Sequence, residues 1–254
     1  MLRFFTADLH VHTVLSACAE LEMFPEFIME QAQELGLGLI AVTDHNSAEN
    51  AAAMLRAAEG TGIKVLPGME VQTREEVHLL CLFDTLAQVV NWQEEVYAHL
   101  PHLKNREDVF GTQVVLDAGG EPIGTNDRLL ATSTSFSVEQ VVQRVLGLNG
   151  LCIPSHVDRP AYSLIANLGF IPPDLGIVGV EISHLVGPKE ARARFPQLEH
   201  YSLVGSGDAH RLKEMSRRTT LQVAEATVAE LALALAGEDG RGVWVDGFQS
   251  VRIS

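Results

Sequence analysis

Histidines and acidic residues recur where apolar runs of the sequence end. The first run ends with His10 and His12, the second with Asp44 and His45, and the third with Glu70. Residues i and i+2 of an extended chain point to the same side, so His10 and His12 can bind one ion together. Imidazole combined with carboxylate suits Zn²⁺, Mn²⁺ or Fe. This spacing therefore indicates metal chemistry.

The same pattern continues along the chain. His78 lies on the fourth apolar run, His156 follows the fifth, and the last run ends in Asp208 and His210, which repeat the i, i+2 spacing. Six of the ten histidines thus fall at or near the C-terminal end of an expected strand. Parallel α/β folds build their active sites at that edge. A single histidine there is more often structural, but two such pairs with three further histidines predict a metal centre.

Apolar runs alternate with amphipathic stretches, and together they define the elements that must position these residues. The expected strands cover residues 3–11, 37–42, 64–71, 77–83, 151–154, 177–182 and 202–205. Helices are expected over residues 25–35, 47–58, 86–100 and 138–148. A tail after Arg217 adds a strand at 220–223, a helix at 228–236 and a last strand near Val243, expected at the edge of the sheet. The mostly β-then-α order predicts a parallel sheet, open or closed into a barrel.

Composition limits the classes of function. With 254 residues, of which 46% are hydrophobic, the chain can form one folded domain over residues 1–254. Its 33 acidic and 18 basic residues give a net charge of −15, which repels phosphate backbones. A long nucleic acid is therefore not expected as a partner, whereas a small anionic substrate at a metal site remains compatible with this charge.

The cysteines and the apolar runs bear on the compartment. Cys18, Cys81 and Cys152 are widely spaced and form no disulfide framework, which suits a reducing cytoplasm. Cys81 and Cys152 lie inside apolar runs and are expected in the core. No signal peptide is recognisable and no apolar run is long enough to cross a bilayer, so we expect a cytoplasmic protein without a membrane partner.

Residues 104–135 do not follow this alternation. The segment is rich in Gly, Asp, Asn and Thr. We interpret it as an insertion between two βα units that forms a lid over the site and contributes to substrate specificity.

Six short segments, in this order, resemble those of the PHP (polymerase and histidinol phosphatase) family: DLHVHT, TDHN, GME, HLL, SHVDR and GSGDAH. The resemblance covers nearly the whole chain apart from the insertion. It implies an α/β fold, a distorted, TIM-like (β/α)7 barrel, with two or three divalent metals (Zn, Mn or Fe) at the C-terminal rim of the strands.

The resemblance also implies a distribution of ligands among three metals. The first metal would be held by His10, His12, Glu70 and Asp208. Glu70 would bridge to a second metal that also binds His78 and His156, and a third would bind His45 and His210. In the family the third metal normally has another ligand from the first loop, often Asp or His, but here Ala17 and Cys18 stand at those places. Either Cys18 is that ligand, which would favour Zn²⁺ or Fe, or the third site is weak or empty; Glu20 is a weaker candidate.

The expected activity is that of a metal-dependent phosphoesterase, which hydrolyses a small phosphomonoester or nucleotide by a metal-bridged hydroxide. Histidinol phosphate is one substrate within the family. Glu70, Asp208 and His210 are the catalytic candidates. The resemblance assigns phosphate binding to Arg159, and Arg211 and Asn46 are further substrate-binding candidates.

Some residues are expected to support the site or to approach it from outside. Glu181 and His184, in the segment VEISH, are expected to lie behind the ligands or to face the substrate. Asp44 is expected to orient His45, hold the loop or cap the following helix. Arg128 could reach the site from the insertion.

Three other functions remain open. The chain could be a non-catalytic, metal-stabilised PHP module with a regulatory or scaffold role, although its nearly complete ligand set argues against this. It could be a 5′-3′ exonuclease on short oligonucleotides. Hydrolysis of another bond, as in amidohydrolase barrels, usually requires a carboxylated lysine, and no lysine ends a strand in a matching place. The sequence specifies no oligomeric state.

Overall fold

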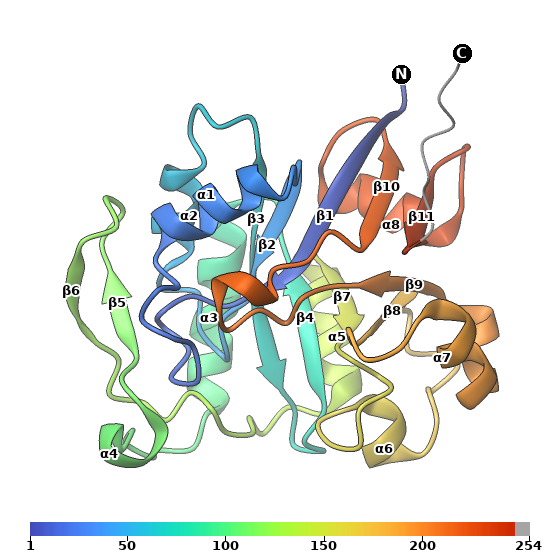
Figure 1. Ribbon diagram of the computed structural model, residues 1–254. Coiled ribbons are helices and arrows are strands. Elements are labelled where there is room, and N and C mark those ends of the chain that lie inside the picture. The colour runs from blue at the N-terminus through green and yellow to red at the C-terminus, as the bar shows by residue number, and fades with distance from the viewer. Residues whose placement is uncertain (247–254) are drawn as a thin grey trace.

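The computed structural model describes residues 1–246, and its centre is a curled, seven-stranded sheet that forms a half-barrel (Figure 1). In spatial order the strands are β11 (Gly242–Val245), β10 (Thr219–Val223), β1 (Arg3–Val11), β2 (Leu39–Val42), β3 (Lys64–Gln72), β4 (His78–Leu82) and β7 (Leu151–Pro154). Two small sheets accompany it, β5 (Val114–Leu116) with β6 (Pro122–Thr125), and β8 (Gly179–Ile182) with β9 (Ser202–Gly205).

Helices connect these strands in the expected alternation. They are α1 (Pro25–Glu34), α2 (Ala51–Ala57), α3 (Leu86–His99), α4 (Glu107–Phe110), α5 (Val138–Gly147), α6 (Leu164–Leu168), α7 (Pro188–Arg194) and α8 (Val228–Ala236), with short 3₁₀ turns at Pro196–His200 and Leu212–Glu214. Capping boxes begin α3 and α5, where Thr85 pairs with Gln88 and Ser137 with Gln140. None of the helices in the described part of the chain is both long and apolar enough to span a membrane.

Strand β4 shows how the sheet separates two regions of the core. Its residues alternate between the two faces. Leu79 and Cys81 pack in a cluster with Trp92 of α3, whereas Leu80 packs in a second cluster with Leu231 of α8. The prediction that Cys81 and Cys152 are core residues is confirmed, since both are buried.

The expectation of a parallel sheet is wrong at two strands. Strands β1, β2 and β3 run parallel, but β4 is antiparallel to β3 and to β7, and β10 is antiparallel to β1. The connection between β3 and β4, residues 73–77, is too short for a parallel crossover, which needs about a dozen residues or more. His78 therefore begins its strand instead of ending it. Because β4 is reversed, this start lies at the same rim as the ends of β1, β2 and β3.

Two boundary predictions have different outcomes. The last strand, β11, lies at the edge of the sheet as expected, and β10 lies between it and β1. The helix expected from Ser47 begins only at Ala51. The preceding residues are bound to α3 instead, since the Ser47 hydroxyl lies 2.6 Å from the Tyr97 hydroxyl and the Ala48 amide donates to Gln93 Oε1 at 2.7 Å.

The insertion packs beside the loop that follows β1. It carries α4 and the β5–β6 hairpin, which lies at one edge of the molecule (Figure 1). The Val114 amide donates to the Val14 carbonyl at 2.9 Å. Gly111 has a φ of +96°, and a Cβ there would come within 2.4 Å of the Ala17 carbonyl oxygen, so only glycine fits this approach. The insertion thus supports the loop that carries Cys18.

The start of α8 provides a test of stability against pH. Glu230 accepts a hydrogen bond from the Ala224 amide at 2.6 Å and pairs with Arg241, also at 2.6 Å. Hydrogen bonding to Arg241 and to the Ala224 amide lowers the pKa of Glu230 from 4.5 to about 2. Because this pKa is lower than in the unfolded chain, the stabilisation is complete above about pH 4.5 and is lost as the pH falls toward 2.

We therefore expect Glu230→Gln to lower the unfolding temperature at pH 7, and the difference from the wild type to shrink steadily below pH 4.5. Thermal unfolding followed by circular dichroism at several pH values measures this. Asp239→Asn is the control, because the Asp239 side chain is 78% exposed and lies 3.8 Å from Arg241. An equal difference at every pH would contradict the prediction.

Candidate metal centre

Eight side chains converge at one rim of the sheet. They are His10, His12, His45, Glu70, His78, His156, Asp208 and His210. They come from β1, from the segments that follow β2, β7 and β9, from within β3, and from the start of β4. All the candidate ligands predicted from the strand ends, apart from Cys18, therefore lie within one cluster.

Glu70 is at the centre of this cluster and is almost completely buried. Its carboxylate oxygens lie 3.0 Å from Nδ1 of His45 and of His78, 3.2 Å from Nε2 of His10, 3.4 Å from Nε2 of His156 and 3.6 Å from Nε2 of His12. Burial opposes ionisation, but the neighbouring His78 and His10 hold the pKa of Glu70 well below its usual range. The centre of the site is thus a buried carboxylate surrounded by imidazoles.

Asp208 provides the second carboxylate. Its Oδ1 lies 3.2 Å from His10 Nε2 and 3.3 Å from His12 Nε2, and its Oδ2 lies 2.6 Å from Arg159 Nη1. Burial favours the neutral form of Asp208, but the neighbouring His10 and His12 hold the pKa of its carboxyl well below the usual range. Asp208 therefore faces the histidine pair of β1 on one side and a cation on the other.

Many of the buried nitrogen and oxygen atoms in this cluster have no hydrogen-bond partner among the described residues. They are Nε2 of His10 and His12, both carboxylate oxygens of Glu70, both ring nitrogens of His78, and Nδ1 of His156. Buried polar atoms without a partner are rare in folded proteins because each one costs free energy. Imidazole nitrogens and carboxylate oxygens suit divalent metals, so this donor set fits such ions.

Three groups of ligand atoms lie close enough together to hold a metal ion, each within 4.8 Å. The groups are His10, His12, Glu70 and Asp208; His45, Glu70 and His78; and His12, His45 and His210. The first is the ligand set that the family resemblance implies for the first metal. The second contains His45 where the resemblance implies His156, and the third adds His12 to the implied pair.

Glu181 supports two candidate ligands from behind. Its Oε2 lies 3.0 Å from Nδ1 of His10 and accepts the backbone amide of His156, also at 3.0 Å. A carboxylate can only accept here, so Nδ1 of His10 carries the proton and Nε2 is left to bind a metal. Of the two expected supporting residues, Glu181 is buried in this position, whereas His184 is exposed.

Two aspartates fix the loops around the site. Asp44 accepts hydrogen bonds at 2.7 Å from the amide and the hydroxyl of Thr13 and from the hydroxyl of Ser16, so it holds the loop after β1. Asp8 accepts the amides of Gly207 at 3.0 Å and Ser216 at 2.7 Å, and its burial raises its pKa to about 7. Asp8 is not among the residues predicted from the sequence, although a carboxylate inside an apolar run is a usable signal.

Cys18 lies beside two of the imidazoles. Burial alone would raise the pKa of its thiol, but hydrogen bonding to His210 and His45 lowers the pKa to about 6. Cys18 does not belong to the three ligand groups, and as a residue it is exposed. Glu20, the weaker candidate, pairs with Arg211 at 2.5 Å.

The substrate-binding candidates differ in their positions. Arg159 faces the site. Arg211 is turned toward Glu20 and toward Glu214, at 3.7 Å.

The Asn46 amide donates to the carbonyls of Leu130 at 2.7 Å and Thr132 at 2.8 Å, and its oxygen accepts the Gln72 amide. Asn46 thus joins the insertion to β3, and its role as a substrate-binding residue remains a prediction. Arg128 packs over the Tyr97 ring, 4.4 Å from its centroid.

Positive φ angles occur at the ends of three strands that carry site residues. They are +48° at Asn46, +30° at His156 and +48° at Asp208. Residues other than glycine rarely adopt this region, at about 1–3 kcal/mol each, and such strain tends to collect at functional sites. The backbone is therefore bent sharply where His45, His156 and Asp208 are presented.

A cavity of about 350 Å³ opens onto this cluster. Its lining consists of His45, Glu70, His78, His156, Arg159, Pro160, Ala161, Tyr162, Asp208 and His210. None of the described insertion residues 104–135 is among them, so the lid role remains a prediction.

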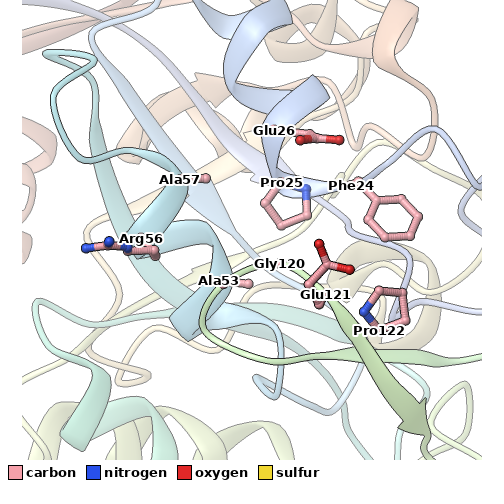
Figure 2. A pocket seen from close by; sticks show the side chains of 10 residues that line it. Phe24, Pro25, Glu26, Ala53, Arg56, Ala57, Gly120, Glu121 and Pro122 are labelled. Atoms are coloured by element: carbon pink, nitrogen blue, oxygen red, sulfur yellow. The ribbon is translucent and has the colours of Figure 1, made fainter.

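A second cavity of about 290 Å³ lies between α1, α2 and the β5–β6 turn (Figure 2). Glu26, Arg56 and Glu121 are the charged residues in its lining. It contains none of the candidate ligands, so the metal chemistry belongs to the first cavity.

Comparison with known proteins supports the resemblance. The model of the PHP domain family matches residues 8–116 of the chain. No curated protein matches the sequence significantly.

Solved structures share the fold at low identity. The lesion-specific endonuclease Q of Pyrococcus furiosus is 21% identical with a TM-score of 0.66, over 95% of this chain and 58% of that one. A complex of Endonuclease Q with a 27-mer duplex containing an abasic lesion is 22% identical with a TM-score of 0.68, over 94% and 58%. A proposed metal-dependent phosphoesterase from Bifidobacterium adolescentis is 22% identical with a TM-score of 0.51, over 81% and 87%. This chain thus spans little more than half of the endonuclease chains.

The contacts of Glu181 generate a prediction about metal affinity. We expect Glu181→Ala to weaken metal binding roughly 10- to 100-fold, because His10 and the His156 backbone lose their anchor while every candidate ligand remains. Glu181→Gln should have a smaller effect. Competition with a chelator for Zn²⁺ measures the affinity, and thermal unfolding without metal separates this effect from stability.

The matched control for Glu181 is Glu190→Ala, an exposed glutamate of α7 that lies 3.8 Å from Arg194. Wild-type affinity in Glu181→Ala would show that this carboxylate does not support the ligands.

Proposed function

We propose that this chain is a metal-dependent hydrolase of phosphoesters that acts on a small phosphomonoester or a nucleotide. The observation that carries the proposal is the cluster of buried imidazole and carboxylate atoms that have no hydrogen-bond partner within residues 1–246. Part of this cluster lines a cavity whose wall also includes Arg159. The PHP domain match over residues 8–116 supports the same conclusion. We propose that the protein resides in a reducing cytoplasm, because its three cysteines are free thiols.

The proposal includes a distorted (β/α)7 barrel. Its seven strands would be β1, β2, β3, β4 and β7 of the central sheet together with β8 and β9. Two contacts support this closure. The Val157 amide after β7 donates to the Glu181 carbonyl of β8 at 2.9 Å, and the Ala209 amide after β9 donates to the His10 carbonyl of β1 at 3.1 Å. This arrangement would bring all the candidate ligands to one rim.

Two or three divalent cations, Zn, Mn or Fe, would be held by the side chains of the cluster. The first would bind His10, His12, Glu70 and Asp208. The second would bind Glu70, His78 and His156. The third would bind His45, His210 and Cys18. When bound, such cations neutralise phosphate charge and make water more acidic.

The protein's own residues would position the phosphoester. The Arg159 guanidinium can donate two hydrogen bonds to phosphate oxygens, and its pairing with Asp208 holds it at the cavity. Nδ1 of His210 lies 3.0 Å from the Asp208 carbonyl, which can only accept, so this nitrogen carries the proton and Nε2 is free to bind. Glu70 and Asp208 remain ionised in this environment, and they supply the negative charge that retains cations.

Cleavage of a nucleic acid is the second candidate. Two similar structures are of endonuclease Q, one of them with a duplex that carries an abasic lesion. The net charge of −15 argues against a long polyanion as the substrate of this chain.

The test of the proposal is hydrolysis by the purified, metal-loaded chain. We expect release of phosphate from phosphomonoesters with Mn²⁺ or Zn²⁺, and a loss of at least about 100-fold in His12→Ala, since a residue that binds the metals acts directly on the reaction. The panel includes dinucleotides, short oligonucleotides and an abasic duplex, which separates the nuclease candidates. His200→Ala, an exposed histidine, is the control.

The outcome that contradicts catalysis is also defined. If the metal-loaded chain hydrolyses no member of the panel and His12→Ala lowers only the thermal stability, the metals hold the fold together and the chain is a scaffold.

Cys18 generates a separate prediction about the third metal. If its thiolate is a ligand, Cys18→Ser should lose up to one metal ion per chain, and the Co²⁺-substituted protein should lose its thiolate-to-metal absorption band. Elemental analysis and absorption spectra measure this, with the buried Cys152→Ala as the control. Unchanged stoichiometry and spectrum would remove Cys18 from the ligand set.

A further inference from the structure

Four consecutive residues form the part of the cavity wall that the candidate ligands leave open. They are Arg159, Pro160, Ala161 and Tyr162, and the other six lining residues all belong to the ligand cluster. A substrate whose phosphate lies at the cluster must therefore place its remaining part against this segment.

This wall is fixed in place by the loop around it. Buried Asp158 accepts the amide of Ser183 at 2.7 Å and its hydroxyl at 2.6 Å. The Arg159 amide donates to the His156 carbonyl at 3.0 Å, and the Ser163 hydroxyl donates to the Arg159 carbonyl at 2.7 Å. Both ends of the segment are thus anchored, so the wall is formed before a ligand arrives.

Tyr162 is the unusual member of this wall. Its backbone has a φ of +55°, and its carbonyl accepts the His78 amide at 3.1 Å. Its ring stacks on the His78 imidazole with centroids 4.9 Å apart and an interplanar angle of 26°, yet the residue is 47% exposed. The imidazole therefore covers part of the ring, while Tyr162 stays about half exposed and lines the cavity. The strained backbone holds a large aromatic ring at the cavity instead of in the core.

We propose that Tyr162 is a stacking surface for a planar aromatic group of the substrate, so that the phosphoester carries a nucleobase or a comparable ring. This inference rests on the proposed phosphoesterase function and specifies its substrate class. The side chains of Pro160 and Ala161 offer no hydrogen-bond donor or acceptor. Recognition by this wall therefore depends on the Arg159 cation at one end, for phosphate, and the Tyr162 ring at the other, for a flat apolar surface.

Binding of two matched ligands tests this directly. The ligands are the phosphonate analogues of adenosine 5′-monophosphate and of ribose 5-phosphate, in which a methylene group replaces the ester oxygen and prevents hydrolysis. They differ at C1 of the ribose, where one carries the base and the other a hydroxyl group. Calorimetry with the metal-loaded chain should show about tenfold tighter binding of the adenosine analogue, as expected for one stacked base.

Two variants isolate the ring. Tyr162→Asn removes it while keeping a residue that accepts a positive φ, and Tyr162→Phe keeps the ring without its hydroxyl. We expect the asparagine variant to lose the tenfold preference by weakening only the adenosine analogue, and the phenylalanine variant to retain it. Phe170→Ala is the control, because Phe170 is 55% exposed and does not line the cavity.

Each other outcome has a defined meaning. Equal binding of both analogues by the wild type, or an unchanged preference in Tyr162→Asn, overturns the stacking role while hydrolysis assays still support the phosphoesterase. Equal weakening of both analogues together with lower metal content in Tyr162→Asn also overturns it, because the ring would then only support His78. A base preference in a chain that hydrolyses no phosphoester supports the stacking surface and contradicts the proposed function.

Discussion

The arrangement of the site depends on one buried interaction, the ionised carboxylate of Glu70 among imidazoles. Its side chain is 1% exposed, yet neither of its oxygens has a hydrogen-bond partner among the described residues. A buried carboxylate without positive charge nearby would be strongly destabilising. The surrounding histidines provide only part of that charge, since burial and neighbouring imidazoles lower the pKa of His12 and of His78. The cluster therefore fits divalent cations, which would supply the remaining positive charge.

This constraint explains why the reversal of β4 matters. Glu70 lies within β3, and the short hairpin that follows makes β4 antiparallel. A parallel neighbour would have put the start of its strand at the opposite edge of the sheet, far from Glu70. The hairpin instead places His78 Nδ1 3.0 Å from the carboxylate. Strand direction, as much as residue spacing, thus determines which side chains can share an ion.

The sequence predicted which side chains cluster because each is marked locally, by a polar residue that interrupts or ends an apolar run. It predicted the contacts of Asn46 and Arg211 poorly for the opposite reason. Asn46 binds carbonyls of the insertion more than eighty residues away, and Arg211 turns toward Glu20 of the first loop. These partners are set by tertiary packing, which leaves no periodic signal. Glu181 is intermediate, since its strand position indicated a supporting role but not that its partners are His10 and His156.

The segment from His156 to Tyr162 begins with a candidate metal ligand and ends in the cavity wall. Both of its ends have positive φ angles, +30° and +55°, and both ends contact the ligand cluster. Glu181 and Asp158 hold its first part to β8 and the residue after it, which offsets the strain. Within residues 159–162, Arg159 pairs with Asp208 and the Tyr162 ring stacks on His78, so these side chains meet the cluster at the cavity wall. Substitutions at Pro160 and Ala161 would then change the surface beside the proposed phosphate position, while the candidate ligand atoms of β1, β3 and β4 keep their places.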